Sequence, residues 1–350
     1  MVEIKPYDDQ CHRLQVQALF ADVGFKAELW DYQFTVNPGA KARGFQPVVA
    51  EDSGKVIGFN GVVPVSILWN GKPCDALWSC DFKVKDDYRG QGVGRLIKES
   101  LAGMSPVLMS FGISPVAAIV LAKMGWQASR DVHFLKRVCR PGSARDVALM
   151  VYQFLMAILN RSAGDAHYQI AERDALPSAS EVDELWQEVW AGYSKAVVRD
   201  WAYMDWRYQQ HPLANYRFLE LRDDAGALRA IGVVRARGGQ VRLVDYLGPA
   251  QDKPLKQALV KAMLSHWNDA SAYSSMTSDA EFKQVMKSCG FYQGREQPRF
   301  YVWASPHTFG PEDCDQAPTG WFIMGGDSDG ELLQAARESW NDNATGREDV

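Results

Sequence analysis

The sequence predicts an α/β fold made of two tandem domains, each with a mixed, mostly antiparallel sheet flanked by helices. Three observations predict it. Strand and helix patterns alternate, a motif recurs 174 positions later (205 − 31), and 350 residues suit two domains of ~100–200 residues. We expect a first domain over 1–140, a linker helix over 141–165, a second domain over 166–331 and a polar C-terminal tail over 332–350.

The first domain begins with strands joined by tight turns. Segments rich in Val, Ile, Phe and Trp predict these strands, and the turn sequences Asp52-Ser53-Gly54 and Asn70-Gly71 separate them. A glycine-rich loop, a helix, a strand and a second helix follow. The expected ranges are strands at Gln46–Ala50, Lys55–Leu68 and Ala76–Val84, a helix to Leu101, a strand at Val107–Phe111, a helix at Pro115–Met124 and extended chain at Trp126–Val138.

A repeated motif indicates that the second domain duplicates the first. Asp31-Tyr32-Gln33-Phe34 with Asn37-Pro38 is matched by Asp205-Trp206-Arg207-Tyr208 with His211-Pro212. In both copies a hairpin, a strand containing an aspartate (Asp81 or Asp245), a helix, a short strand and a second helix follow. The order and spacing agree although few residues are identical.

The linker is expected to form an apolar helix over Asp146–Asn160. Such a helix could lie on a membrane surface, but this one lacks the Lys- and Arg-rich polar face of interfacial helices. A helix packed against one or both domains is therefore the favoured interpretation.

Composition excludes several classes of function. Lys and Arg total 38 against 43 Asp and Glu, and the net charge of −5 argues against a dedicated nucleic-acid binder. No apolar run reaches the ~18–20 residues of a membrane span, and the N-terminus lacks a secretory signal pattern. The six cysteines form no CxxC pair and the six histidines show no ligand spacing. We expect a reduced, cytoplasmic protein without a metal site.

One loop has the chemistry of a phosphate site. Arg89-Gly90-Gln91-Gly92-Val93-Gly94 lies between a strand and a helix, so backbone N–H groups and the positive end of the helix dipole are available to an anion. The matching loop of the second copy, Gly248–Pro254, contains two prolines and Asp252, which remove donors and add a repelling charge. The glycine spacing fits neither the P-loop nor the dinucleotide motif.

This loop resembles motif A of the GCN5-related N-acetyltransferases, and Lys123-Met124-Gly125-Trp126 resembles the helix end of that family. The tandem arrangement is similar to duplicated acetyltransferase-like proteins, including the FemAB-like group. The resemblance implies that acetyl-CoA, or another acyl-CoA, binds between two diverging strands. Val84 would then line the pantetheine, and Phe82 would also contact the cofactor. The backbone of Arg89, Gly90, Gln91, Gly92, Val93 and Gly94 would hold the pyrophosphate. An amine would attack the thioester directly. A backbone N–H near the point where the two strands diverge would hold the oxyanion.

The catalytic residues are less well defined by the sequence. Asp81, on the strand before the loop, is the first candidate for the base, but Asp245 occupies the matching place in a copy without a phosphate loop, which favours a structural role. The family's tyrosine, which protonates CoA, is replaced here by Leu121. Ser114 is the candidate acid, although Ser before Pro115 is also a common helix N-cap.

Aromatic residues near the repeat motif are candidates for the acceptor site. Trp30, Tyr32 and Arg207 could contact a sugar ring or an acidic group, but core packing between the two copies is the more common role of such residues. The resemblance implies an N-acyltransferase that acts on a primary amine of a small molecule such as an amino sugar, an amino acid or a cell-envelope precursor. The alternatives are an inactive tandem binding protein and a FemAB-like aminoacyl transferase. The sequence leaves the oligomeric state open.

Overall fold

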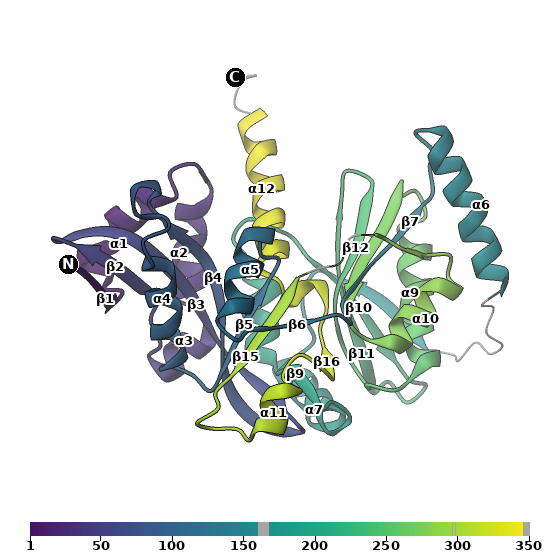
Figure 1. Cartoon of the computed structure of the whole chain (residues 1–350). Helices are drawn as coiled ribbons and strands as arrows, with labels where there is room; N and C mark the ends of the chain where they lie inside the picture. The colour runs from purple at the N-terminus through teal and green to yellow at the C-terminus, as the bar shows by residue number, and fades with distance from the viewer. Residues whose placement is uncertain (160–167, 296, 298, 346–350) are drawn as a thin grey trace.

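The computed structural model describes residues 1–159, 168–295, 297 and 299–345. The chain forms two open sheets, each flanked by helices (Figure 1). The first sheet has the strand order β1-β2-β3-β4-β5-β15-β6, and β9 and β16 extend it from β3. The second sheet has the order β14-β7-β13-β12-β11-β10-β8. Within each sheet neighbouring strands are antiparallel except β4 with β5, β12 with β13 and β9 with β16. The predicted α/β class is confirmed.

The elements of the first half agree closely with the predicted order. Asn37 and Ser114 cap the helices that begin at Pro38 and Pro115, so both helix starts are encoded locally. The bounds are β1 Val2–Pro6, α1 Asp9–Leu19, α2 Lys26–Phe34, α3 Pro38–Arg43, β2 Val48–Asp52, β3 Lys55–Trp69, β4 Lys72–Val84, η1 Asp86–Tyr88, α4 Val93–Ala102, β5 Val107–Phe111, α5 Pro115–Lys123, β6 Gln127–Ser129, β7 His133–Val138 and α6 Ala144–Leu159.

The second half repeats this order and then adds a C-terminal segment. Its bounds are β8 Gln169–Arg173, α7 Ala179–Val189, η2 Trp190–Gly192, β9 Lys195–Val197, α8 Trp201–Met204, η3 Asp205–Gln209, β10 Arg217–Arg222, β11 Leu228–Arg237, β12 Gln240–Leu247, α9 Lys253–His266, β13 Ala272–Thr277, α10 Ala280–Ser288, β14 Tyr292–Gln293, β15 Phe300–Ala304, α11 Pro311–Asp315, β16 Trp321–Phe322, η4 Gly325–Asp327 and α12 Asp329–Thr345.

The two halves exchange one strand each. In the first sheet β15, from the second half, lies between β5 and β6. In the second sheet β7, from the first half, occupies the corresponding place between β13 and β14. Each sheet is therefore completed by the other half, and the chain crosses between the sheets after β6 and after β14.

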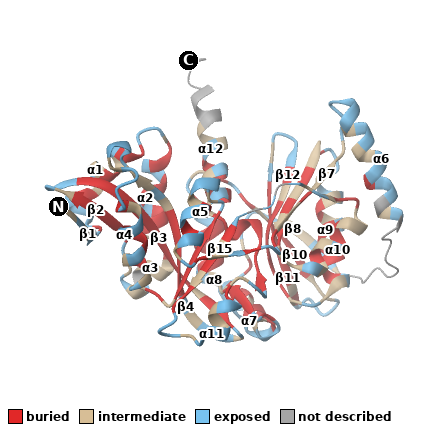
Figure 2. Cartoon of the chain, viewed as in Figure 1, coloured by how far each residue is buried: buried red, intermediate tan, exposed pale blue. Residues whose placement is uncertain are grey.

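Helices cover both faces of the first sheet. Because side chains alternate along a strand, Val48 and Ala50 of β2 face a core shared with α4 and α5, whereas Val49 faces the core shared with α1 and α2. Figure 2 shows the strands as largely buried. In the described part of the chain, no helix is long and apolar enough to cross a membrane.

Of residues 332–350, which we expected to form a polar tail, 332–345 belong to helix α12, and 346–350 lie outside the described residues. Glu331 of α12 accepts hydrogen bonds from Arg235 of β11 and Arg242 of β12, at 2.6 and 2.5 Å. At the other end of the helix, Trp340 lies against Gly24 in the first half. These contacts with both halves order a segment whose polar composition alone does not predict burial.

Candidate active site

The loop before α4 has the backbone of an anion-binding turn. Gly90 and Gly92 adopt φ values of +78° and +84°, and a Cβ at either position would meet no heavy atom within 4 Å among the described residues. Glycine is needed there for the left-handed backbone and not for packing. Within the described structure α4 has no side-chain N-cap, so its first N–H groups remain available to a ligand.

The corresponding loop of the second half is closed. Asp252 caps α9 by accepting a hydrogen bond from the Leu255 N–H at 2.9 Å, and Pro254 occupies the first turn. The Asp252 N–H itself donates to Glu281. A phosphate at this position would compete with two carboxylates, so only the first of the two loops has the features of an anion site.

Strands β4 and β5 diverge immediately before the open loop. They pair at Ala76, Leu77 and Trp78, and the parallel ladder then ends. Here β4 contains a bulge, in which Asp81 and Phe82 lie opposite the single residue Asn60 of β3 and Asp81 adopts φ +47°. A bulge leaves a backbone group outside the ladder, at the position where the two strands separate.

The divergence opens into a cleft of about 710 Å³. Its walls come from β4, the glycine loop, α4, the end of β5, α5 and the first turn of α12. Val84, Ile113, Val116 and Leu121 give it an apolar side. All of the predicted cofactor residues except Gln91 line it: Phe82, Val84, Arg89, Gly90, Gly92, Val93 and Gly94.

Asp81 lines the cleft but is engaged in a buried ion pair. Its carboxylate binds Lys26 Nζ, and the two side chains are 6% and 3% exposed. The second half contains the counterpart, in which Asp245 binds Arg199 at 3.0 Å and accepts a hydrogen bond from Tyr208 at 2.6 Å. A buried aspartate–cation pair is thus common to both halves, whether or not a phosphate loop follows.

Ser114 also lines the cleft, at the N-terminus of α5. Its Oγ accepts a hydrogen bond from the Ala117 N–H at 3.2 Å, which is the expected N-cap contact. A serine hydroxyl that accepts one bond retains a proton to donate. Leu121, about two turns further along α5, is buried and contributes to the apolar side of the cleft.

Sequence reasoning missed Asp329. This residue begins α12 and reaches the end of β5, where its Oδ1 would lie 3.9 Å from a Cβ on Gly112. Burial, and secondarily the charge of Asp81, raise the pKa of Asp329 to about 7. The sequence around it, Asp327-Ser328-Asp329-Gly330, has the polar composition of a solvated turn and gives no sign of burial.

Lys98 of α4 is a second titratable group in the cleft. Its Nζ donates a hydrogen bond to Ser79 Oγ and lies 5.0 Å from the centroid of the Phe82 ring. Burial lowers the pKa of Lys98 to about 7. The pKa of Asp329 is therefore raised toward 7 and that of Lys98 is lowered toward 7. Two groups with such shifted pKa values in one cleft are typical of a reaction site.

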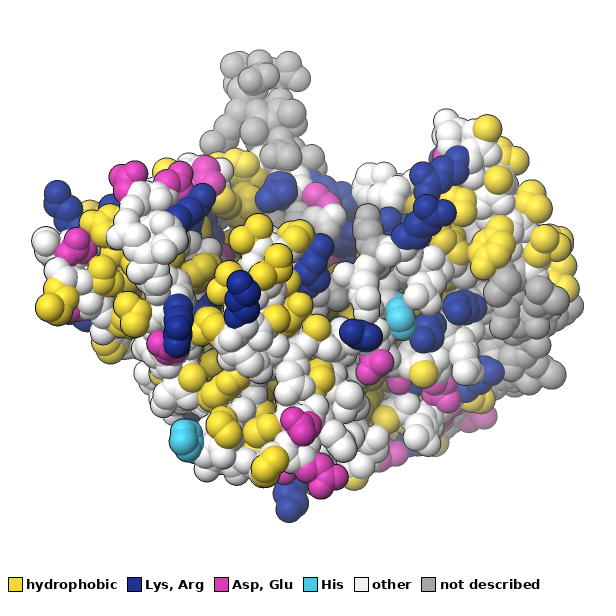
Figure 3. Space-filling model, in the orientation of Figure 1, with side chains coloured by type: hydrophobic (Ala, Val, Ile, Leu, Met, Phe, Trp, Pro, Cys, Tyr) yellow, Lys and Arg dark blue, Asp and Glu magenta, His cyan; other side chains and the backbone are white. Residues whose placement is uncertain are grey.

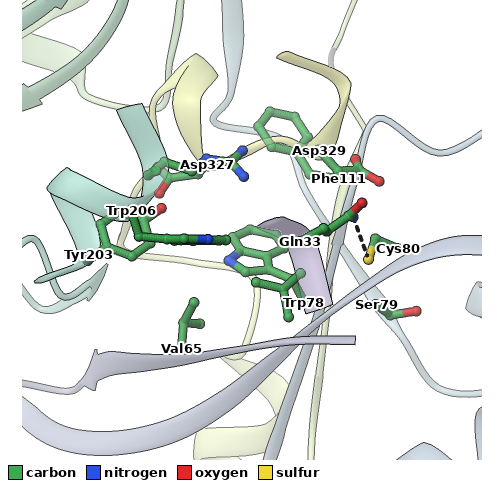
Figure 4. A pocket seen from close by; sticks show the side chains of 12 residues that line it. Gln33, Val65, Trp78, Ser79, Cys80, Phe111, Tyr203, Trp206, Asp327 and Asp329 are labelled. Carbon is green, nitrogen blue, oxygen red and sulfur yellow. Dashed lines mark hydrogen bonds between the residues drawn. The ribbon is translucent and has the colours of Figure 1, made fainter. Parts of the chain in front are cut away.

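A small internal cavity of about 20 Å³ adjoins the cleft at Ser79, Cys80, Phe111 and Asp329 (Figure 4). This volume is close to the ~10–15 Å³ that one water requires. Side chains from both halves line it: Gln33, Val63, Val65, Trp78, Tyr203, Trp206, Arg207 and Asp327. The predicted acceptor residue Arg207 is thus at the cavity, where its guanidinium donates to the carbonyls of Gly326 and Ser328.

The other two predicted acceptor residues lie in the core. Trp30 packs against the rings of Tyr7, Phe34 and Phe59. Tyr32 is buried and donates a hydrogen bond to the Arg207 carbonyl at 3.0 Å. Neither residue lines the cleft or the internal cavity.

Comparison with known proteins places this geometry in a fold family. No protein-family model and no curated protein matches the sequence. A GCN5-related N-acetyltransferase from Anabaena variabilis ATCC 29413 superposes with TM-score 0.61 at 13% identity, covering 87% of this chain and 73% of that one. This chain has the GCN5-related N-acetyltransferase fold.

Two further structures share the fold. A conserved protein of unknown function from Enterococcus faecalis V583, described as a probable N-acyltransferase, has TM-score 0.65 at 9% identity, covering 87% of this chain and 73% of that one. The N-myristoyltransferase of Saccharomyces cerevisiae with bound myristoyl-CoA has TM-score 0.55 at 12% identity, covering 92% and 89%. The FemAB-like part of the resemblance is not confirmed by these matches.

Proposed function

We propose that this protein is an acyl-CoA-dependent N-acyltransferase that transfers an acetyl group to a primary amine of a small molecule. The observation that carries the proposal is the divergence of β4 from β5 beside an uncapped glycine loop, which together form the cleft of about 710 Å³. The loop N–H groups would hold the CoA pyrophosphate, and Phe82 and Val84 would line the pantetheine arm.

The size of the internal cavity favours a short acyl group. The thioester would lie where β4 and β5 diverge. The internal cavity of about 20 Å³ that adjoins the cleft has room for roughly one water-sized group. An acetyl methyl is of this size, whereas a long acyl chain would require the buried rings of Trp78 and Trp206 to move. The acetyl donor is therefore preferred over the myristoyl donor that the yeast neighbour binds.

Asp329 is the best-placed base for the reaction. A carboxylate with its pKa raised to about 7 is basic enough to accept a proton from the amine. The amine nitrogen would attack the carbonyl carbon, forming the C–N bond, and its proton would pass to Asp329. The backbone at the Asp81–Phe82 bulge would hold the oxyanion.

The C–S bond then breaks and the thiolate leaves. Ser114 is the candidate donor of a proton to it, since its hydroxyl lines the same cleft. Asp81, held by Lys26, would position the bulge rather than exchange a proton. The cysteines are free thiols, which fits a reaction in the reducing cytoplasm.

Calorimetric titration with acetyl-CoA, CoA and myristoyl-CoA tests the donor, and release of the CoA thiol with a panel of primary amines tests the acceptor. We expect calorimetry to show one acetyl-CoA site per chain, and we expect the release of the CoA thiol to depend on the amine. Binding without turnover of any amine would support the inactive binding protein instead. Absence of CoA binding would overturn the proposal.

A further inference from the structure

Helix α6 turns its larger apolar side chains outward. Val147, Val151, Phe154 and Ile158 follow a 4-3-4 spacing that places them on one face of the helix, and Leu155 lies beside them. These five side chains belong to residues that are 51–66% exposed. Figure 3 shows the resulting hydrophobic surface over α6 on the right of the molecule, and Figure 2 shows the helix as largely exposed.

The inner face of α6 is attached through a polar side chain. Gln153 is buried, accepts a hydrogen bond from the Val138 N–H at 2.7 Å and donates one to the Val138 carbonyl at 3.0 Å. The helix contacts α10 and β7. A surface helix normally buries its larger apolar side chains, so their exposure on one face of α6 is unusual. An exposed apolar stripe of this kind marks an interaction surface.

The elements that contact α6 carry mainly positive charge, although the whole chain carries a net charge of −5. The only acidic residues of α6, β7, α10 and the 139–143 connection are Asp146 and Glu281. Asp146 accepts hydrogen bonds from Gly142 and Ser143, and Glu281 pairs with Lys256. The cations of the same elements are Lys136, Arg137, Arg140, Arg145, Lys283 and Lys287.

We propose that α6 docks this protein on an anionic lipid surface, with the stripe formed by Val147, Val151, Phe154, Leu155 and Ile158 inserted among the lipid chains. At ~1.5 Å per residue α6 is about 24 Å long, short of the ~30 Å hydrocarbon core, so it lies in the plane of the interface. The surrounding lysines and arginines would attract the anionic headgroups. The polar face that the helix itself lacks is supplied by β7 and α10.

The dimensions of the stripe favour a lipid surface over a second copy of this chain. From residue 147 to residue 158 the stripe is ~17 Å long, and a helix is ~10 Å wide, which gives a footprint of ~170 Å². A stable interface between proteins buries about 800 Å² on each partner. Cations on both copies would also repel each other across such an interface, whereas anionic lipid neutralises them.

Co-sedimentation of the full chain with phosphatidylcholine vesicles, prepared with and without phosphatidylglycerol, tests the proposal. We expect binding only to the vesicles that contain phosphatidylglycerol, and release at high salt. The double substitution Phe154→Ser/Leu155→Ser should weaken binding at least about tenfold, because it removes two inserted apolar side chains. Leu14→Ser, at an 82% exposed residue of α1, is the matched control and should bind as the wild type does.

The alternatives give distinct results. Wild-type protein that stays in the supernatant with both vesicle types overturns the proposal, as does unchanged binding by the double variant with an unaltered thermal unfolding curve. A wild-type dimer that the double substitution converts to a monomer, without vesicle binding, would assign the stripe to self-association instead. Analytical ultracentrifugation distinguishes this outcome.

Discussion

Trp206 and Tyr32 occupy equivalent positions of the internal repeat, 174 residues apart, and they contact each other directly. The Trp206 indole N–H donates a hydrogen bond to the Tyr32 carbonyl at 2.9 Å, and the two rings stack at 5.5 Å with an interplanar angle of 22°. The duplicated helices therefore meet at the interface between the halves. The aromatic residue of the repeated motif therefore has a structural role in both copies, because each copy supplies one ring to the contact that joins the halves.

The strand exchange makes each half dependent on the other. Residues 1–165 alone would lack β15, and residues 166–350 alone would lack β7, so each sheet would lose the strand that joins its edge strand to the rest. We expect neither fragment to show a cooperative unfolding transition by circular dichroism, and the two together to form a 1:1 complex. A protease site inserted at 160–167 and cleaved after folding is the control, which should remain a single species. An independently folded fragment would contradict this prediction.

Substitution of Gly92 tests the anion loop. Gly92→Val places a β-branched residue at φ +84°, which forces the loop backbone to change and removes bonds to the pyrophosphate. Hydrogen bonds to a charged group contribute ~1.5–3 kcal/mol, so we expect CoA affinity to fall by about 10- to 100-fold in calorimetry. Gly226→Val, in the β10–β11 hairpin at φ +83°, is strained to a similar extent but does not line the cleft, and it should bind CoA normally. Equal losses in both variants would indicate general destabilisation.

Local sequence signals predicted the loop, but they did not predict the exchange of strands. Glycine spacing between a strand and a helix depends only on neighbouring residues, so the Arg89–Gly94 loop could be located from the sequence. The apolar patterns of β7 and β15 predict strands without specifying which sheet each one joins. The sheet that β7 or β15 joins is decided by the path of the chain after β6 and after β14. No local sequence pattern encodes that path.

The burial of Asp329, the base that we propose, has a similar explanation. Asp329 lies in a polar segment just before the expected tail, and its burial depends on the attachment of α12 by Glu331 to Arg235 and Arg242. These partners are about ninety positions earlier in the chain. Asp81 was visible in the sequence because it belongs to the strand before the loop, but its ion pair with Lys26 was not.

Substitution of Asp81 distinguishes a structural role from a catalytic one. Asp81→Asn leaves Lys26 charged and buried without its carboxylate, so the free energy of unfolding should fall by about 3–5 kcal/mol in denaturant titration. The double variant Lys26→Met/Asp81→Leu removes both charges and should recover much of this loss. We expect kcat in the folded fraction of the Asp81→Asn protein to fall less than in Asp329→Asn, because Asp81 positions the bulge and does not exchange the proton. Normal stability with a large loss of kcat would make Asp81 the base.

Asp329→Asn tests the proposed base. Removal of a general base lowers the rate by about 10²- to 10⁴-fold, while acetyl-CoA affinity should be retained because the loop is unchanged. The sign of the pH effect follows from the raised pKa. The wild-type carboxyl is protonated and inactive below about pH 7, so kcat/KM should rise through pH 7 as Asp329 loses its proton. In the Asn variant the contribution of Asp329 should disappear, leaving the titrations of Lys98 and of the amine substrate.

A matched control separates catalysis from the attachment of α12. Glu338→Gln lies on the same helix and weakens an ion pair with Arg235, but it is outside the cleft. It should therefore lower stability slightly and leave the pH profile with its step near 7. If Glu338→Gln abolishes that step as Asp329→Asn does, the pH dependence belongs to the docking of α12 rather than to proton transfer. If Asp329→Asn retains both kcat and the step, the base must be another group in the cleft.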